Sequence, residues 1–249
     1  MNDAEPAHDS VYDDATRIAE SVRVGQHREI IGGMWEELGR LQFEFLLRQG
    51  LRPEHRVLDV GAGSLRLGVK LVAFLEPGGY WAVDKNTALL DAGWTLELGP
   101  LGLQARQPRA QLVTLDDFQF DRLGQTFDYA IAQSLFTHLS WNRIRKCLAR
   151  LAPAINEHGR LFATFFEVPT GSDRETAATH MPGGVETYSD RDPYHYSLAD
   201  LREAAGGLPW QVELLGEWGH PRDQRMVVFT KQTPNDRPTR ILSADEAGN

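Results

Sequence analysis

A glycine-containing loop between two short apolar stretches is the feature best suited to chemistry. Gly61-Ala62-Gly63 follows the run Val57–Val60, in which Asp59 stands two residues before the first glycine. Asp84 closes the next apolar run, 21 residues after Gly63. Glycine permits a tight turn and lets a ligand approach the backbone closely. An acid at this distance can accept hydrogen bonds from the hydroxyls of a ribose, so the pattern indicates a site for an adenosine-type ligand.

Alternating strands and helices are predicted around this loop. The expected strands are 55–60, 80–83, 111–115, 127–132, 160–166, 211–215 and 225–230, and the expected helices are 34–47, 66–75, 87–94, 142–151 and one starting at a capping box, Ser197–Asp200. This order specifies an α/β fold, a doubly wound, seven-stranded, mostly parallel sheet with a C-terminal antiparallel hairpin. Ligands of such sheets bind at the carboxyl ends of the strands, which is where the glycine loop lies.

The chain resembles the class I S-adenosylmethionine-dependent methyltransferases over roughly residues 30–230. The motifs that carry the resemblance are Asp59-x-Gly61-x-Gly63, Asp84, Asp116-Asp117-Phe118 and Phe127–Ser134, in that order. The resemblance implies a Rossmann-like methyltransferase fold and S-adenosyl-L-methionine as the cofactor. One position departs from the pattern, because the family often has a third glycine where this chain has Leu65.

The resemblance also implies cofactor-binding roles for residues that follow the strands. These residues are Asp59, Gly61, Ala62, Gly63, Asp84, Lys85, Asp116, Asp117, Phe118 and Gln133. The glycine loop would pass under the methionine part of the cofactor, Asp84 would hold its ribose, and Gln133 would lie near its sulfonium. The adenine amino group would donate to Asp116 or Asp117, with Phe118 packed beside the ring.

Catalytic candidates come from loops at the same end of the sheet, over 133–139, 167–196 and 217–224. Methyl transfer is an in-line displacement that requires alignment and exclusion of water. A base is needed only where the acceptor is a hydroxyl or an ammonium group. The candidates are His138, His220 and Glu167. Each has a structural alternative, because a histidine can bond a backbone carbonyl, a carboxylate can cap a strand and a rigid turn can surround His220.

The segment 168–196 has little regular pattern and is a candidate substrate lid. Loops of this length inside compact domains are usually lids, binding loops or disordered connectors. Tyr188, Tyr194, His195 and Tyr196 provide aromatic and hydrogen-bonding groups suited to a small organic molecule. A solvated connector is the alternative.

The excess of acidic residues lies mainly at the ends of the chain. The net charge is −9 for 249 residues, of which −5 falls within residues 1–20 and −1 within 232–249. We therefore expect flexible segments at 1–25 and 232–249 around a methyltransferase domain at 26–231. The lack of a basic surface argues against a nucleic-acid partner. No apolar run reaches the roughly 18 residues of a membrane helix, and the acidic start without an apolar stretch predicts no secretory leader, so we expect a cytoplasmic protein without a membrane partner.

The expected activity is methyl transfer from S-adenosylmethionine to an oxygen or nitrogen of a small organic molecule. The alternative is a protein of the same fold that binds the cofactor without methylating, either as a regulator or in a rearrangement or cyclisation. A nicotinamide enzyme would need glycine at position 66, which is Arg66. The one cysteine, Cys147, is expected in the core, and no metal site is predicted. The oligomeric state stays open.

Overall fold

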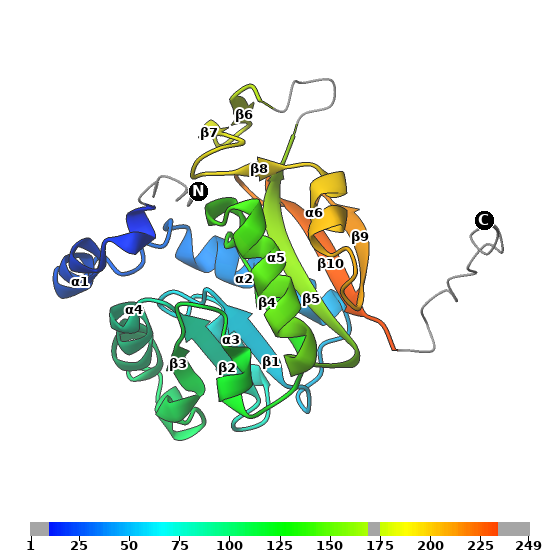
Figure 1. The fold of residues 1–249 in the computed structure, drawn as a ribbon. Coiled ribbons are helices and arrows are strands. Elements are labelled where there is room, and N and C mark those ends of the chain that lie inside the picture. The colour runs from blue at the N-terminus through cyan, green and yellow to red at the C-terminus, as the bar shows by residue number, and fades with distance from the viewer. Residues whose placement is uncertain (1–9, 169–174, 234–249) are drawn as a thin grey trace, which may run out of the picture.

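The structure, a computed structural model, describes residues 10–168 and 175–233. A central sheet has the strand order β3-β2-β1-β4-β5-β10-β9, and a short strand β8 pairs with β5 (Figure 1). The strands are β1 (Val57–Val60), β2 (Tyr80–Asp84), β3 (Leu112–Thr114), β4 (Phe127–Ala132), β5 (Ile155–Glu167), β8 (His195–Tyr196), β9 (Trp210–Gly216) and β10 (Arg225–Lys231). β10 is antiparallel to both of its neighbours, whereas β1 to β5 are parallel. The predicted doubly wound sheet with a C-terminal hairpin is confirmed, and β8 is an addition to it.

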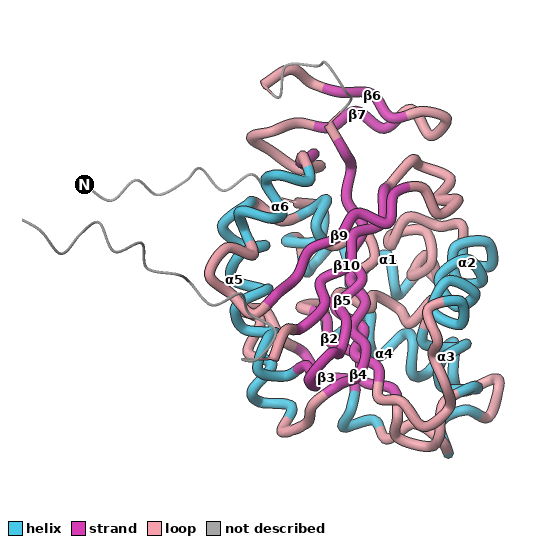
Figure 2. The backbone as a smooth tube through the Cα atoms, turned by 90° about the vertical axis from the view of Figure 1, so that its right-hand side faces the viewer, coloured by secondary structure: helices cyan, strands magenta, loops and turns pink. Residues whose placement is uncertain are grey.

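Helices cover both faces of this sheet. The helices are α1 (Ala15–Arg23), α2 (Trp35–Arg48), α3 (Gly68–Phe74), α4 (Thr87–Ala92), α5 (Trp141–Leu151) and α6 (Leu198–Ala204). The other helical turns are η1 (Val11–Asp13), the π-helical turn η2 (Gly93–Leu98), η3 (Leu103–Ala105), η4 (Arg109–Gln111), η5 (Phe120–Leu123), η6 (Phe136–His138) and η7 (Ala152–Ala154). Figure 2 shows the sheet edge-on, with α5 and α6 on one side and α2 and α3 on the other.

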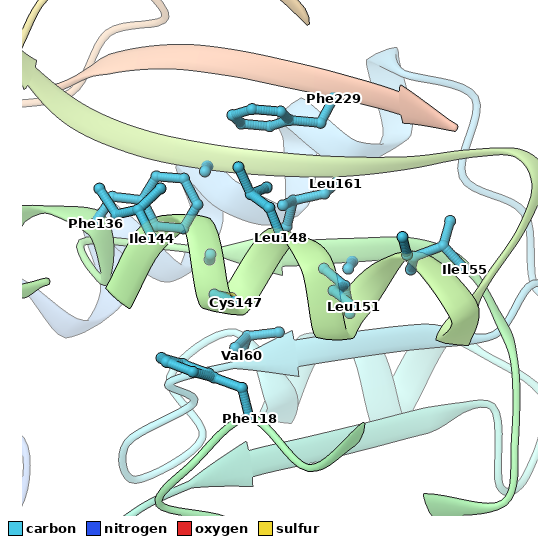
Figure 3. Close-up of a cluster of buried hydrophobic side chains, with 14 of the residues drawn as sticks. Val60, Phe118, Phe136, Ile144, Cys147, Leu148, Leu151, Ile155, Leu161 and Phe229 are labelled. Atoms are coloured by element: carbon cyan, nitrogen blue, oxygen red, sulfur yellow. The ribbon is translucent and has the colours of Figure 1, made fainter. Parts of the chain in front are cut away.

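The side chains of the central strands alternate between these two layers. Leu161 of β5 packs with α5 and α6, and its neighbour Phe162 packs with α2 and α3. In the first layer, α5 presents Ile144, Cys147 and Leu148 to the sheet (Figure 3). Cys147 is fully buried, as expected, and burial raises the pKa of its thiol to about 12.

The N-terminal region differs from the flexible segment expected over residues 1–25. Ser10 and Asp13 form a capping box around η1, α1 follows, and Ile18 is fully buried while α1 packs against α4. Composition gives no sign of these contacts, which involve one buried apolar residue and a few specific polar groups. Residues 1–9 lie outside the described part of the chain.

The segment 168–196 is more regular than its sequence suggests. β6 (Ala178–His180) and β7 (Val185–Thr187) form a separate antiparallel ribbon beyond the end of the main sheet (Figures 1 and 2). Residues 169–174 lie outside the described residues, as do 234–249 of the tail predicted to be flexible. Across the described ranges, no helix is both long and apolar enough to span a membrane.

Candidate functional site

A cavity of about 470 Å³ opens at the carboxyl ends of β1, β2 and β4. This volume is typical of sites for small molecules and cofactors. Most of the predicted site residues line it, namely Asp59, Gly61, Ala62, Gly63, Asp84, Lys85, Asp116, Phe118, Gln133 and His138. Asp117, Glu167 and His220 do not line it.

The glycine loop requires its glycines for backbone conformation and for space. Gly61 and Gly63 have φ angles of 74° and 54°, a region that disfavours other residues. A Cβ atom on Gly63 would lie 2.9 Å from Cγ2 of Ile31. The N–H of Gly61 donates to the carbonyl oxygen of Val83 at 2.8 Å, which fixes the loop against β2.

Leu65 occupies the place of the missing third glycine without disturbing this loop. It has a φ of 68°, so it adopts the left-handed conformation that glycine favours. Its side chain is fully buried. A Cβ atom on Gly93 would lie 2.4 Å from Cγ of Leu65, so the absence of a side chain at 93 makes room for the leucine. The departure from the family pattern is compensated within the fold.

Asp84 is held rigidly beside the glycine loop. Its two carboxylate oxygens accept the N–H of Gly63 at 2.9 Å and the N–H of Asn86 at 2.8 Å. Burial raises the pKa of Asp84, and these two hydrogen bonds oppose the rise. Each oxygen retains a lone pair for a further hydrogen bond, so the carboxylate can still accept from hydroxyls in the cavity.

Several buried polar side chains lie below the glycine loop. Asp59 accepts a hydrogen bond from the hydroxyl of Tyr80 at 2.9 Å, and burial raises its pKa to about 7. Arg66 donates to the carbonyl oxygen of Gly33 at 2.9 Å, and burial lowers its pKa to about 10. Within the described residues, Nε of Arg66 and Oε1 of Gln42 are buried without a hydrogen-bond partner. Buried polar atoms of this kind require a partner, and both residues line the cavity.

The acceptor-side candidate His138 is paired with an acid that sequence reasoning missed. Nδ1 of His138 lies 2.5 Å from Oδ1 of Asp192. Burial raises the pKa of Asp192, but the hydrogen bond with His138 and the neighbouring Ser10 outweigh this effect and leave the pKa lowered. The ring of Tyr12 meets the ring of His138 edge-on, with centroids 4.9 Å apart. Tyr12, Ser10 and Asp192 all line the cavity.

His220 is buried behind Gln133, outside the cavity lining. Its Nε2 lies 3.1 Å from Nε2 of Gln133, and its Nδ1 accepts the N–H of Arg222 at 3.1 Å. Burial, together with the charges of Arg222 and Arg66, lowers the pKa of His220 to about 3. A neutral ring with both nitrogens engaged is a poor general base, so the geometry favours a supporting role toward Gln133.

Two carboxylates predicted for the site point elsewhere. Glu167 ends β5 but lies 3.7 Å from Nε of Arg225. Strand β5 continues beside β8, which carries its end beyond the cavity. Asp117 contacts Lys146 and lies 3.5 Å from Arg150, both on α5, and the hydrogen bond from Lys146 lowers its pKa. Asp116 alone of the acidic pair lines the cavity. The described residues contain no cluster of three or more potential metal-binding His, Cys, Asp or Glu side chains.

Comparison with known proteins supports the fold. No family model matches the chain. One similar structure is magnesium protoporphyrin IX methyltransferase from Synechocystis PCC 6803 with bound S-adenosylmethionine, at 17 % identity and a TM-score of 0.58 over 88 % of this chain and 98 % of that one. Another is an O-methyltransferase family protein from Burkholderia thailandensis, at 12 % identity and a TM-score of 0.64 over 90 % and 64 %.

A third similar structure is the glycopeptide N-methyltransferase MtfA complexed with S-adenosyl-L-homocysteine, at 17 % identity and a TM-score of 0.55 over 78 % and 89 % of the two chains. Sequence identities this low support a shared fold alone. The protein has the Rossmann-like fold of the class I S-adenosylmethionine-dependent methyltransferases, as the sequence motifs predicted.

Proposed function

We propose that the protein is an S-adenosylmethionine-dependent methyltransferase that acts on an oxygen or nitrogen of a small organic molecule. The observation that carries the proposal is the direct bond between the two motifs, in which the N–H of Gly63 donates to Asp84 at the edge of the cavity. This bond joins a loop shaped for close approach of a ligand to an acid placed for a ribose. The solved methyltransferases of similar fold, two of them with bound cofactor or its product, support the same assignment.

The cavity offers groups that fit each part of this cofactor. Nε of Arg66 and Oε1 of Gln42 suit the carboxylate and ammonium of its methionine part, since they are buried donors and acceptors without partners among the described residues. Asp84 suits the ribose. Asp116 and Phe118 suit the adenine, and the guanidinium of Arg143 lies 5.6 Å from the centre of the Phe118 ring. When bound, the cofactor supplies a methyl carbon activated by a sulfonium.

We assign to His138 the removal of a proton from the acceptor. Its Nδ1 faces Asp192, so a proton on Nδ1 leaves the lone pair of Nε2 available. A carboxylate in this position orients the ring and stabilises the cation that forms when Nε2 takes a proton. The segments that carry Tyr12 and Asp192 cover this side of the cavity, which helps to exclude water during the displacement.

Calorimetric titration with S-adenosylhomocysteine tests the cofactor assignment. We expect wild-type protein to bind and Asp84→Ala to bind at least about 100-fold more weakly, because two hydrogen bonds to a charged group are lost. Asp91→Ala is the matched control, since Asp91 pairs with Arg109 outside the cavity. Equal binding by Asp84→Ala and wild type would refute the ribose assignment, and no binding by wild type would refute the proposed function.

A panel of small acceptors then separates methyl transfer from the alternative. Methyl transfer predicts products that gain one methyl group in place of hydrogen, detected by mass spectrometry. Cofactor binding with products that lack this gain would favour a rearrangement or cyclisation, and cofactor binding with no product would favour a regulator.

A further inference from the structure

The segment Ser10–Asp13, here called the N-terminal strap, forms one wall of the cavity. Three of its residues line the cavity, namely Ser10, Tyr12 and Asp13. On one side the carbonyl oxygen of Tyr12 accepts from Nδ2 of Asn86 at 3.2 Å, and Asp13 forms an ion pair with Lys85. On the other side Ser10 lies near the side chain of Asp192 and lowers the pKa of its carboxyl. The strap thus contacts both the ribose side of the site and the His138–Asp192 pair.

The strap brings the phenol ring of Tyr12 to the junction of these two sides. The ring meets His138 edge-on, with centroids 4.9 Å apart and planes at 70°. Its hydroxyl lies within electrostatic reach of Arg66, Asp192 and Asp84. Burial raises the pKa of this hydroxyl, so the ring presents a neutral phenol to the cavity.

A second aromatic side chain lines the cavity beside the same histidine. Tyr194 donates its N–H to the carbonyl oxygen of Thr137, the residue before His138, at 2.7 Å. Its ring stacks on Tyr196 with centroids 6.1 Å apart and planes at 18°. Tyr196 is fixed in turn, because its hydroxyl donates to the carbonyl oxygen of Leu139 at 2.6 Å. The wall around His138 therefore contains rigid aromatic surfaces from two distant parts of the chain.

We propose that the acceptor is a phenol, a planar aromatic compound with an ionisable hydroxyl group, and that Tyr12 is one of the residues that contact it. This inference rests on the proposed function and specifies its acceptor. Aromatic rings pack favourably edge-to-face or offset against Tyr, Phe and His rings, which is the geometry that Tyr12 already adopts toward His138. The His138–Asp192 pair, with Nδ1 and Oδ1 2.5 Å apart, takes up the proton as the phenolate forms.

The reaction balances with groups already described. The O–H bond of the phenol breaks, and its proton passes to Nε2 of His138. The phenolate oxygen forms a bond to the methyl carbon, and the bond from that carbon to the sulfonium breaks with its electron pair remaining on sulfur. Asp192 stabilises the protonated imidazole until the proton leaves to solvent.

Binding of 4-nitrophenol to the protein saturated with S-adenosylhomocysteine tests the inference without turnover. Calorimetry gives the affinity, and the absorbance of the nitrophenolate reports whether the bound hydroxyl is ionised. We expect wild type to bind 4-nitrophenol and to favour the phenolate. We expect Tyr12→Phe to stay within about threefold of wild type, because the ring is kept, and Tyr12→Ala to bind about tenfold more weakly, because an aromatic contact is lost.

Tyr188→Ala is the matched control, because the side chain of Tyr188 contacts Arg191 and Glu186 outside the cavity. It is expected to bind 4-nitrophenol as wild type does. Affinity for S-adenosylhomocysteine and thermal unfolding show whether each variant is folded. Cyclohexanol, which has the hydroxyl without the planar ring, is expected to bind at least about tenfold more weakly than 4-nitrophenol.

Four results would overturn the inference. Equal binding of cyclohexanol would remove the aromatic requirement, and unchanged binding by a folded Tyr12→Ala would remove the contact. Tighter binding by Tyr12→Ala would show instead that Tyr12 fills the place of the acceptor. If wild type binds S-adenosylhomocysteine but no phenol, only this inference fails, whereas loss of S-adenosylhomocysteine binding itself refutes the proposed function.

Discussion

The two sides of the cavity are built in different ways. The cofactor side comes from the ends of neighbouring parallel strands and is held by backbone hydrogen bonds such as that from Gly61 to Val83. It consists of residues 59–63, 66, 84–86, 116 and 118. The acceptor side, residues 10–13, 133–138 and 192–194, joins three segments that are far apart in the sequence. Its contacts are mostly between side chains, such as the pair His138–Asp192, 54 residues apart.

This difference predicts how each side responds to substitution. The sheet fixes the cofactor side, so a change there should alter both the affinity for the cofactor and the stability of the fold. The acceptor side depends on a few side-chain contacts around His138, so a change there should alter the rate of transfer and leave cofactor affinity nearly intact. The following predictions test this contrast, beginning with the largest effect.

Gly63→Val should reduce affinity for S-adenosylhomocysteine by at least about 100-fold. The new Cβ atom would lie 2.9 Å from Ile31, and a β-branched residue is strained at a φ of 54°. Gly102→Val is the matched control, since Gly102 has a φ of 67° with nothing within 4 Å of its Cβ position. Both variants should lower the unfolding temperature, but calorimetry should detect weaker binding only for Gly63→Val. Equal losses of affinity in both variants would show that backbone strain alone, and not the contact with Ile31, weakens binding.

Asp192→Asn should slow single-turnover methyl transfer by about 100-fold, the usual contribution of a positioned general base. An asparagine cannot stabilise the protonated His138 that forms during transfer. Affinity for S-adenosylhomocysteine should remain within about twofold of wild type, since Asp192 is bonded to His138 on the acceptor side. Asp190→Asn provides the control, because that side chain is 70 % exposed on the same loop. A large loss of cofactor affinity in Asp192→Asn would contradict the separation between the two sides.

Sequence reasoning reached the cofactor side because its signals are local. The glycines at the end of one apolar run and the acid at the end of the next lie within about thirty residues of each other. Because the ends of parallel strands meet at one edge of the sheet, these residues can be placed together from the sequence. The sequence does not show whether Asp116 or Asp117 faces the site, because neighbouring residues in a short turn can face opposite ways. Only the structure shows that Asp117 turns toward Lys146 and that Asp116 lines the cavity.

The acceptor side was only partly accessible for the same reason. The position of His138 after β4 was predicted, but its partner Asp192 lies in a segment without periodic pattern, and Tyr12 lies in a stretch dismissed for its acidic composition. Glu167 lies at the end of β5 and His220 in the hairpin loop, as predicted, but Glu167 forms an ion pair with Arg225 and His220 contacts Gln133, and neither lines the cavity. Direction of a side chain is a tertiary property that spacing does not encode.

Glu97→Gln should lower the free energy of unfolding at pH 7 by about 2 kcal/mol, less than the loss expected for a fully buried ion pair, because Arg28 is 43 % exposed. Glu97 accepts hydrogen bonds from Nε and Nη2 of Arg28 at 2.7 and 2.6 Å, and lies 2.6 Å from Nε2 of His27. Ser64 of the glycine loop bonds the carbonyl oxygen of His27 at 3.0 Å. The cofactor side therefore also depends on contacts between residues far apart in the sequence. Urea unfolding of the variant measures what these contacts contribute to stability.

The contribution of Glu97 should depend on pH in a defined direction. Burial raises its pKa, but hydrogen bonds from Arg28 and His27 outweigh this effect and leave the pKa below its ordinary value of 4.5. A lowered pKa in the folded state means that the stabilisation is complete above pH 4.5 and is lost as the pH falls through the folded value. The difference between wild type and Glu97→Gln should therefore shrink in urea unfolding below about pH 4. A difference that grows on acidification would show that Glu97 is not ionised in the folded protein.

Asp13→Asn should have the smallest effect of these substitutions. Asp13 lies where the cofactor side and the acceptor side meet. Asp13 pairs with Lys85 next to Asp84, but its side chain is 51 % exposed, so the pair should contribute less than about 1 kcal/mol. Affinity for S-adenosylhomocysteine should fall by no more than about threefold at low salt, and the difference should vanish at high salt because exposed charges are screened. Glu20→Gln, which removes an exposed pair with Arg23 away from the cavity, should leave affinity unchanged at either salt concentration. A larger, salt-independent loss in Asp13→Asn would mean that the strap forms part of the cofactor side as well as the acceptor side.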